Sequence, residues 1–110
     1  MKINVIIPVF NEIGNIENLT SEIEKTLLGS LNFEIVFVND SSDDGSLEIL
    51  KGLKSQKPYL RLFSHKKRFG QSAAILTGVR AAKGSLVATL DGDGQNNPED
   101  LINLYNLYVK

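Results

Sequence analysis

The 110-residue sequence has no cysteine and no long apolar segment. The absence of cysteine excludes disulfides, thiolate nucleophiles and cysteine-based zinc sites, and it fits a reducing compartment. No window approaches the ~20 apolar residues that a membrane-spanning helix needs. The apolar residues 3–10 are too few for a signal peptide and are interrupted by Asn4 and Pro8. We therefore expect a soluble, cytoplasmic chain that forms one domain, residues 1–110.

Two phosphate-binding signatures are also missing. The sequence has neither the GxGxxG motif of dinucleotide-binding Rossmann proteins nor the GxxxxGK[ST] motif of P-loop NTPases, and both classes are therefore disfavoured. The formal net charge of −1 provides no electrostatic footprint for nucleic acid or an anionic membrane. The single histidine, His65, is expected to be packed or exposed rather than catalytic. No Ser-His-Asp or Cys-His arrangement can be argued.

Apolar residues predict strands that alternate with helices. The strands are expected at residues 2–8, 33–38, 60–64 and 85–90. Helices are expected between Asn15 and Gly29, from Leu47 to before Pro58, over 71–82, and around 101–108. The small residues of the third helix would let it approach the sheet closely. This alternation predicts an α/β fold, with a parallel sheet covered by helices on both faces.

A half-Rossmann winding would give this sheet the strand order 3-2-1-4. The first and fourth strands would then be neighbours at the point where the winding reverses, and ligands bind at the carboxyl ends of such strands. We therefore expect the turns at 8–12 and 91–95 to face each other. The acidic turn after the second strand would lie alongside, so that three polar turns converge on one crevice.

The turn at 91–95 is the candidate metal site. Asp91 and Asp93 follow the fourth predicted strand directly, and Gln95 adds a neutral oxygen. Mg²⁺ commonly takes one or two carboxylates together with substrate phosphates. Gly92 has no side chain, so a sugar or a phosphate could approach the backbone there. The alternative is a simple turn followed by the helix-start signal of residues 97–100, because Asp is common in turns.

Other charged residues lie near the same crevice. Asp40 follows the second strand directly and is placed to accept hydrogen bonds from a nucleobase. Asp43 and Asp44 are expected to cap the second helix and to stabilise its dipole. Glu12 would lie at the mouth of the crevice. The basic residues 66–68 fit equally a solvated turn and a cation beside a diphosphate.

Four segments, in this order, resemble family 2 glycosyltransferases. Residues 8–12 resemble the opening loop of that family, and residues 38–46 resemble its Val-Asp-Asp-Gly-Ser-x-Asp-Gly-Thr segment. Residues 68–74 resemble its Asn-x-Gly-x-x-x-Ala segment. Residues 91–99 resemble its Asp-x-Asp-x-Gln-x-x-Pro-Glu segment. The last segment points to the branch that includes dolichyl-phosphate mannose synthase and bacterial polyprenyl-phosphate glycosyltransferases.

The resemblance implies the N-terminal half of a GT-A fold. It also implies a UDP- or GDP-sugar donor, Mg²⁺ or Mn²⁺, and a polyprenyl phosphate as the acceptor. Carried over by position, the nucleotide-binding residues are Pro8, Phe10, Glu12, Asp40 and Asp91, beside Gly92. The metal ligands are Asp93 and Gln95, with Asp91 at the nucleotide and close to the metal.

The chain departs from the family pattern in sequence and in length. Asn39 replaces the first Asp of the base-site pair, Ser41 replaces Gly and Arg68 replaces Asn, so Asp40 is expected to carry base recognition. Family members continue well past this point, and the resemblance places the general base and the membrane-associated parts there, at the cytoplasmic face. We therefore expect a donor-binding part that is inactive alone and that self-associates through its exposed final helix.

Two other functions stay open. A nucleotidyltransferase with a GT-A-like site would carry a Gly-rich, basic phosphate loop after the first strand, and residues 8–15 have no basic residue. A non-catalytic module akin to a receiver domain would also use an Asp-rich pocket and Mg²⁺. Its phospho-accepting Asp would lie at the end of the third strand, where this sequence has none.

Overall fold

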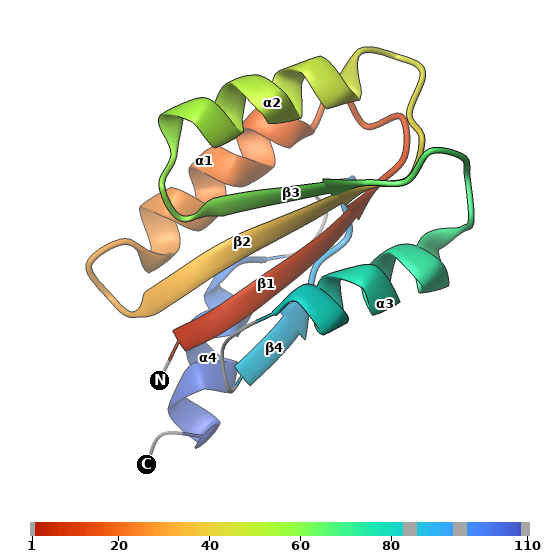
Figure 1. The fold of residues 1–110 in the computed structure, drawn as a ribbon. Coiled ribbons are helices and arrows are strands. Elements are labelled where there is room, and N and C mark those ends of the chain that lie inside the picture. Colours follow the sequence, from red (N-terminus) through yellow and green to blue (C-terminus); the bar gives the residue numbers. More distant parts are fainter. Residues whose placement is uncertain (1, 83–85, 94–96, 109–110) are drawn as a thin grey trace.

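The computed structural model describes residues 2–82, 86–93 and 97–108. Strands and helices alternate along the chain as predicted (Figure 1). The elements are β1 (Lys2–Val9), α1 (Ile16–Leu27), β2 (Asn32–Asn39), α2 (Ser46–Gln56), β3 (Leu60–Ser64), α3 (Gln71–Ala81), β4 (Leu86–Thr89) and α4 (Glu99–Tyr108). Ser85, the predicted start of the fourth strand, lies outside the described residues. None of the helices that the structure describes is long and apolar enough to cross a membrane.

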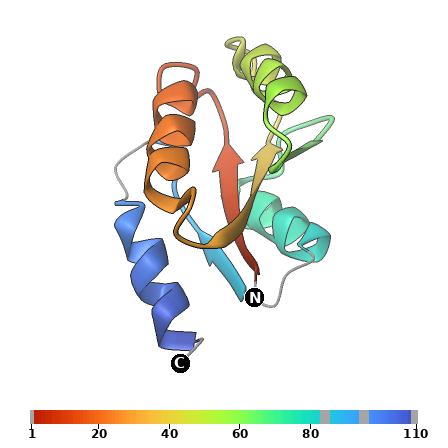
Figure 2. The same ribbon diagram turned by 90° about the vertical axis from the view of Figure 1, so that its left-hand side faces the viewer.

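The four strands form one parallel sheet in the order β3-β2-β1-β4, which confirms the predicted winding. The central strand β1 pairs with β2 over its whole length, from Lys2↔Asn32 to Val9↔Asn39. Its pairing with β4 is shorter and ends at Ile6↔Thr89. Helices α1, α2 and α4 cover one face of the sheet, and α3 covers the other (Figures 1 and 2). The carboxyl ends of β1 and β4 therefore open towards the same edge.

Strand β1 continues through Pro8 to Val9, whereas the sequence predicted that Pro8 would end it. The N–H of Leu90 donates to the carbonyl of Ile6, and the N–H of Asp40 donates to the carbonyl of Val9. The backbone N–H and C=O groups of even-numbered residues of β1 therefore point towards β4, and those of odd-numbered residues point towards β2. Pro8 lies beyond the last residue that pairs with β4, so its missing N–H costs no hydrogen bond of the sheet.

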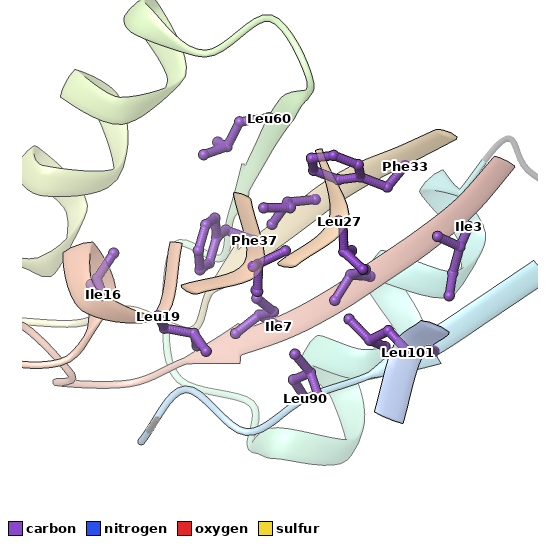
Figure 3. Packing of buried hydrophobic residues seen from close by; sticks show 14 of the residues in the cluster. Ile3, Ile7, Ile16, Leu19, Leu27, Phe33, Phe37, Leu60, Leu90 and Leu101 are labelled. Atoms are coloured by element: carbon purple, nitrogen blue, oxygen red, sulfur yellow. The ribbon is translucent and has the colours of Figure 1, made fainter. Parts of the chain in front are cut away.

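The core is formed by strands that are buried on both faces. Alternate residues of β1 enter two clusters: Ile3 and Ile7 lie under α1, and Ile6 lies under α3. The larger cluster also contains residues of β2, α1, α4 and the end of β4 (Figure 3). Its labelled members are Ile3, Ile7, Ile16, Leu19, Leu27, Phe33, Phe37, Leu60, Leu90 and Leu101. The continuous apolar runs of the sequence are thus explained by burial on two sides.

Two predicted helix starts have different outcomes. Helix α4 begins as predicted, because the Asn97 side-chain oxygen accepts a hydrogen bond from the N–H of Glu99 at 3.0 Å. The prediction that the Asn15 side chain caps α1 is wrong. Its amide donates instead to the Glu12 carboxylate at 2.8 Å. The Asn15 side chain thus binds the turn that carries Glu12 rather than the first turn of α1.

Helix α3 lies close to the sheet because of Gly78, as the small residues of this helix predicted. A Cβ atom at Gly78 would overlap the Cγ2 atom of Ile6 and would lie 3.4 Å from Cγ2 of Val38. Ile6 and Val38 are fully buried, so neither has free space into which to move. The hydrogen atom of glycine thus sets the distance between α3 and the two central strands.

We predict that Gly78→Ala lowers the free energy of unfolding by about 1–3 kcal/mol, the usual cost of an overfilled core. The matched control is Gly52→Ala on α2, where nothing lies within 4 Å of an added Cβ. That change should leave the free energy unchanged or raise it by up to about 1 kcal/mol, the difference in helix propensity. Urea denaturation measures both. A Gly78→Ala protein as stable as Gly52→Ala would contradict the close packing of α3.

Candidate functional site

A pocket of about 400 Å³ opens at the carboxyl edge of the sheet, where the turns after β1 and β4 meet. It is lined by Pro8, Val9, Phe10, Glu12, Asp40, Arg68, Gln71, Ala74, Asp91, Gly92 and Asp93. The lining includes every predicted site residue that the structure describes. Gln95 lies outside the described residues. Segments far apart in the sequence therefore converge on one crevice, at the position that the strand order predicted.

The turns after β1 and β4 touch at Gly92. A Cβ atom there would lie 2.9 Å from the carbonyl oxygen of Pro8 and 3.4 Å from Cγ of Glu12. The sequence predicted that the missing side chain would leave room for a sugar or a phosphate. The position that a side chain would take is occupied by the chain's own Pro8 and Glu12, while Gly92 itself lines the pocket, so the approach of a ligand there stays a prediction. Gly92 thus allows the two polar turns to pack against each other, with Asp91 and Asp93 on either side of the contact.

Asp91 and Asp93 are both exposed on the rim of this pocket. The side-chain amide of Gln71 on α3 donates to the Asp91 carboxylate at 3.4 Å. Within residues 2–82, 86–93 and 97–108, no three His, Cys, Asp or Glu side chains are grouped closely enough to hold a metal ion. A pair of carboxylates on one turn is the usual protein share of a Mg²⁺ site that is completed by phosphate oxygens. The donor set therefore fits a divalent cation shared with a phosphate-bearing ligand.

The turn after β1 has one strained residue, which the turn after β2 holds in place. Asn11 has a φ of 54°, which is uncommon for a residue other than glycine. Its N–H donates to Ser42 Oγ at 3.0 Å, and its side-chain oxygen accepts from the N–H of Asp43 at 2.9 Å. The carboxylate of Asp43 makes no hydrogen bond to the residues that the structure describes, so the prediction that it caps α2 is wrong.

Asp44 and Ser46 extend this link between the two turns. Asp44 accepts hydrogen bonds from the N–H of Ser46 at 3.0 Å and from the N–H of Ile13 at 3.2 Å. Ser46 Oγ accepts in turn from the N–H of Glu12 at 3.1 Å. Partial burial raises the pKa of Asp44, but the bonds from Ser46 and Ile13 outweigh this and hold the pKa below its ordinary value. As predicted, Asp44 caps the start of α2, and it also fixes the loop that carries Glu12.

Asp40 is 3% exposed, and its carboxylate accepts hydrogen bonds from three donors of the chain. Oδ1 accepts from His65 Nδ1 at 2.8 Å and from the N–H of Phe69 at 2.9 Å. Oδ2 accepts from the N–H of Gly70 at 2.7 Å. Burial alone would raise the pKa of Asp40, but these three hydrogen bonds lower it below its ordinary value. Because a carboxylate offers about four acceptor positions, one remains for a ligand in the pocket.

His65 is packed, which is one of the two expectations from the sequence, but its partners were missed. Its Nε2 atom lies 2.8 Å from Thr77 Oγ1, and the Phe69 ring meets the imidazole edge to face at 5.5 Å. No sequence motif links Asp40 to His65. A usable signal lay in the strand ends: Asn39 of β2 pairs with Ser64 of β3, and Asp40 and His65 are the residues that follow this pair. Carboxyl ends of neighbouring parallel strands place such residues side by side.

Of the three basic residues 66–68, Arg68 lines the pocket. Its guanidinium lies over the Phe10 ring, with Cζ 3.8 Å from the ring centroid. Lys67 lies instead over Phe69, with Nζ 5.4 Å from that centroid. A stacked guanidinium keeps its N–H donors at the edge of its plane, where they can bind oxygen atoms. Arg68 therefore places a permanent positive charge in the same pocket as Asp91 and Asp93.

Comparison with known proteins agrees with this geometry. Residues 4–110 match the family described as glycosyl transferase family 2. A dolichol-phosphate mannosyltransferase of Pyrococcus furiosus is 40% identical over 99 residues, which are 90% of this chain and 28% of that protein. An undecaprenyl-phosphate 4-deoxy-4-formamido-L-arabinose transferase of Aeromonas hydrophila is 37% identical over 103 residues, covering 90% of this chain and 31% of that protein. The chain thus spans less than a third of the length of these relatives.

Solved structures give the same picture. The mannosyltransferase PcManGT of Pyrobaculum calidifontis, in complex with GDP-Man and Mn²⁺, superposes with a TM-score of 0.75 and 29% identity over 83% of this chain and 27% of that one. Residues 1–349 of TarS from S. aureus, in complex with UDP-GlcNAc, superpose with a TM-score of 0.82 and 26% identity over 96% of this chain and 30% of that one. The fold is therefore that of the GT-A glycosyltransferases. With the family match over nearly its whole length, this chain belongs to glycosyl transferase family 2.

Proposed function

We propose that the chain is the donor-binding part of a metal-dependent enzyme that transfers a sugar from a UDP- or GDP-sugar to a polyprenyl phosphate. One observation carries the proposal: Asp91 and Asp93 share a pocket with Phe10 and Asp40, on opposite sides of the strand-order reversal. The similar structures were determined with GDP-Man and Mn²⁺ or with UDP-GlcNAc. The similar sequences are named as transferases acting on dolichol phosphate or undecaprenyl phosphate.

The pocket divides naturally into two ends. We assign the nucleoside to the end formed by Pro8, Phe10 and Asp40. The open acceptor position on Asp40 suits a nucleobase N–H, and the lowered pKa keeps this carboxylate ionised at neutral pH. We assign the diphosphate to the rim that carries Asp91 and Asp93. These assignments put the base in the more buried part of the pocket and the phosphates near solvent.

The leaving group of the proposed transfer is a nucleoside diphosphate, on which negative charge develops. A bound divalent cation, Mg²⁺ or Mn²⁺, would supply charge neutralisation at this leaving group. Asp91 and Asp93 would hold the cation together with Gln95, and Asp91 would also contact the nucleotide. Arg68, which lines the same pocket, would add a donor to the phosphate oxygens. These residues bind and orient the donor.

We assign no general base to this chain. Asp40 and Asp44 each accept hydrogen bonds that the fold needs, and Glu12 accepts one from Asn15. A carboxylate held in this way would have these hydrogen bonds weakened if it took up a proton, because a neutral carboxyl group is a poorer acceptor. The polyprenyl phosphate acceptor is proposed from the named relatives.

The metal site can be tested by isothermal titration calorimetry. We predict that UDP or GDP binds to the wild-type chain more tightly with Mn²⁺ than without it. Asp93→Ala should abolish the effect of Mn²⁺, because it removes one of two carboxylates on the metal-binding turn. The matched control is Asp43→Ala, which removes an exposed carboxylate from a turn outside the pocket lining.

The control variant should bind both nucleotides with wild-type affinity and the same dependence on Mn²⁺. Equal loss in the two variants would mean that the acidic turn after β2 holds the metal. Absence of Mn²⁺-dependent binding of UDP and of GDP to the wild type would contradict the proposed function.

The role of Arg68 gives a second prediction. Arg68→Ala should weaken Mn²⁺-dependent binding of the preferred nucleoside diphosphate by about tenfold, as expected for the loss of one charge-assisted contact. Lys67→Ala removes the same charge from the neighbouring residue, which contacts Phe69 and does not line the pocket. Its affinity should stay within about twofold of wild type at 0.15 M salt, where distant surface charges are screened. Equal weakening in both variants would mean that Arg68 acts only through general electrostatic attraction, and it would contradict a direct contact with the phosphates.

A further inference from the structure

We propose that His65 is a positioning residue for nucleotide binding: it orients the Asp40 carboxylate towards the pocket, and Thr77 holds the imidazole in place. The inference rests on the proposed function, in which this pocket binds a nucleoside diphosphate. His65 and Thr77 lie outside the four segments that carry the family resemblance. Neither of them lines the pocket. Their effect on a ligand would therefore pass through Asp40.

The donor in the contact between His65 and Asp40 is the ring nitrogen. Asp40 is almost completely buried and has a lowered pKa, so its carboxylate carries no proton at neutral pH. The proton between Nδ1 and Oδ1, which are 2.8 Å apart, must therefore be on Nδ1. In the neutral ring this leaves Nε2 without a proton, and Nε2 accepts from the hydroxyl of Thr77 at 2.8 Å. The structure thus selects the Nδ1–H tautomer of neutral His65.

Thr77 makes this arrangement insensitive to the charge of the ring. A hydroxyl can donate or accept, so Thr77 donates to Nε2 of the neutral ring and accepts from Nε2–H of the protonated ring. In both states Nδ1–H points at Asp40. The side chain of Thr77 comes from α3, and Asp40 follows β2. The imidazole therefore connects the carboxyl end of β2 to helix α3.

The three donors fix Asp40 from two directions. The N–H groups of Phe69 and Gly70 come from the turn that leads into α3, and they contact one oxygen each. His65 adds a second bond on Oδ1, beside that of Phe69. Oδ1 thus accepts two hydrogen bonds, and Oδ2 accepts one, from Gly70. The remaining acceptor position is therefore on Oδ2. Loss of the imidazole donor would free a position on Oδ1, so that a ligand N–H could be met by either oxygen and in more than one orientation.

Two substitutions separate the halves of the imidazole. In His65→Asn the amide nitrogen is attached as Nδ1 is, so it can still donate to Asp40 while the bond to Thr77 is lost. In His65→Gln the amide nitrogen is attached as Nε2 is, so it reaches Thr77 and leaves Asp40 without the donor. Each variant loses one hydrogen bond of the pair. His65→Gln loses the bond to the ionised Asp40, so its free energy of unfolding should fall more than that of His65→Asn. Affinities are therefore compared under conditions in which both variants are fully folded, so that a difference reports on Asp40 rather than on overall stability.

The experiment is calorimetric titration of the whole chain with UDP and GDP in the presence of Mn²⁺. We expect His65→Asn to bind within about twofold of wild type and His65→Gln to bind about tenfold more weakly, as for the loss of one hydrogen bond to an ionised group. Urea denaturation of the two variants is the control for folding. Equal affinities of His65→Gln and wild type would overturn the inference while leaving the proposed function intact. Absence of binding by the wild type would instead contradict the proposed function itself.

A spectroscopic measurement tests the geometry without any nucleotide. His65 is the only histidine, so its ring nitrogen signals in a ¹⁵N NMR spectrum need no assignment. At a pH where the ring is neutral, they should show the Nδ1–H tautomer, and Asp40→Asn should change this pattern. A ring in the Nε2–H form would overturn the role of His65 as the donor to Asp40.

Discussion

Burial of one ionised carboxylate is the interaction on which the polar end of this fold depends. Asp40 is 3% exposed, and an ionised group so deep in a protein is stable when donors surround it. The donors come from the end of β3 and from the turn before α3. Asp40 therefore ties β2, β3 and α3 together at the edge where the pocket opens. Hydrogen bonds to an ionised group are worth about 1.5–3 kcal/mol each, so this junction contributes to the stability of the polar end of the fold.

The other wall of the pocket depends on backbone contact rather than on charge. Strand β1 extends beyond its pairing with β4, and Pro8 lies in this extension, where β1 pairs with β2 alone. Gly92 then returns to the Pro8 carbonyl and leaves space for no side chain between them. Asp91 and Asp93 lie on either side of this contact. The close approach at Gly92 places the turn after β4 against the turn after β1. The N–H groups of Glu12 and Ile13, in the turn after β1, donate to Ser46 and Asp44 and so fix that turn against the turn after β2.

Most of the fold could be predicted from the sequence, because the apolar runs and the helix periods recur in a regular order. Strand order and convergence of the polar turns followed from parallel-sheet topology, and the resemblance supplied the roles that we propose for Asp40 and Asp91. Contacts between side chains were harder to foresee. The hydrogen-bond partners of His65 and Asn15 depend on distances that no local sequence pattern encodes. Asp43 and Asp44 are neighbours of the same residue type, so the sequence could not tell which carboxylate would accept hydrogen bonds at the start of α2. The prediction that Pro8 would end β1 was wrong because Pro8 lies beyond the pairing with β4, where its missing N–H costs no hydrogen bond, while β1 continues beside β2.

The central claim is that the turns after β1 and β4 together hold a divalent cation and a nucleoside diphosphate. Mn²⁺ is paramagnetic, so it broadens the amide signals of nearby residues in a ¹H–¹⁵N NMR spectrum. With UDP or GDP present, substoichiometric Mn²⁺ should first broaden the amides of Phe10, Glu12 and residues 91–93. Without nucleotide the broadening there should be weaker. Broadening centred on residues 41–44, with the signals of 91–93 unchanged, would contradict the claim.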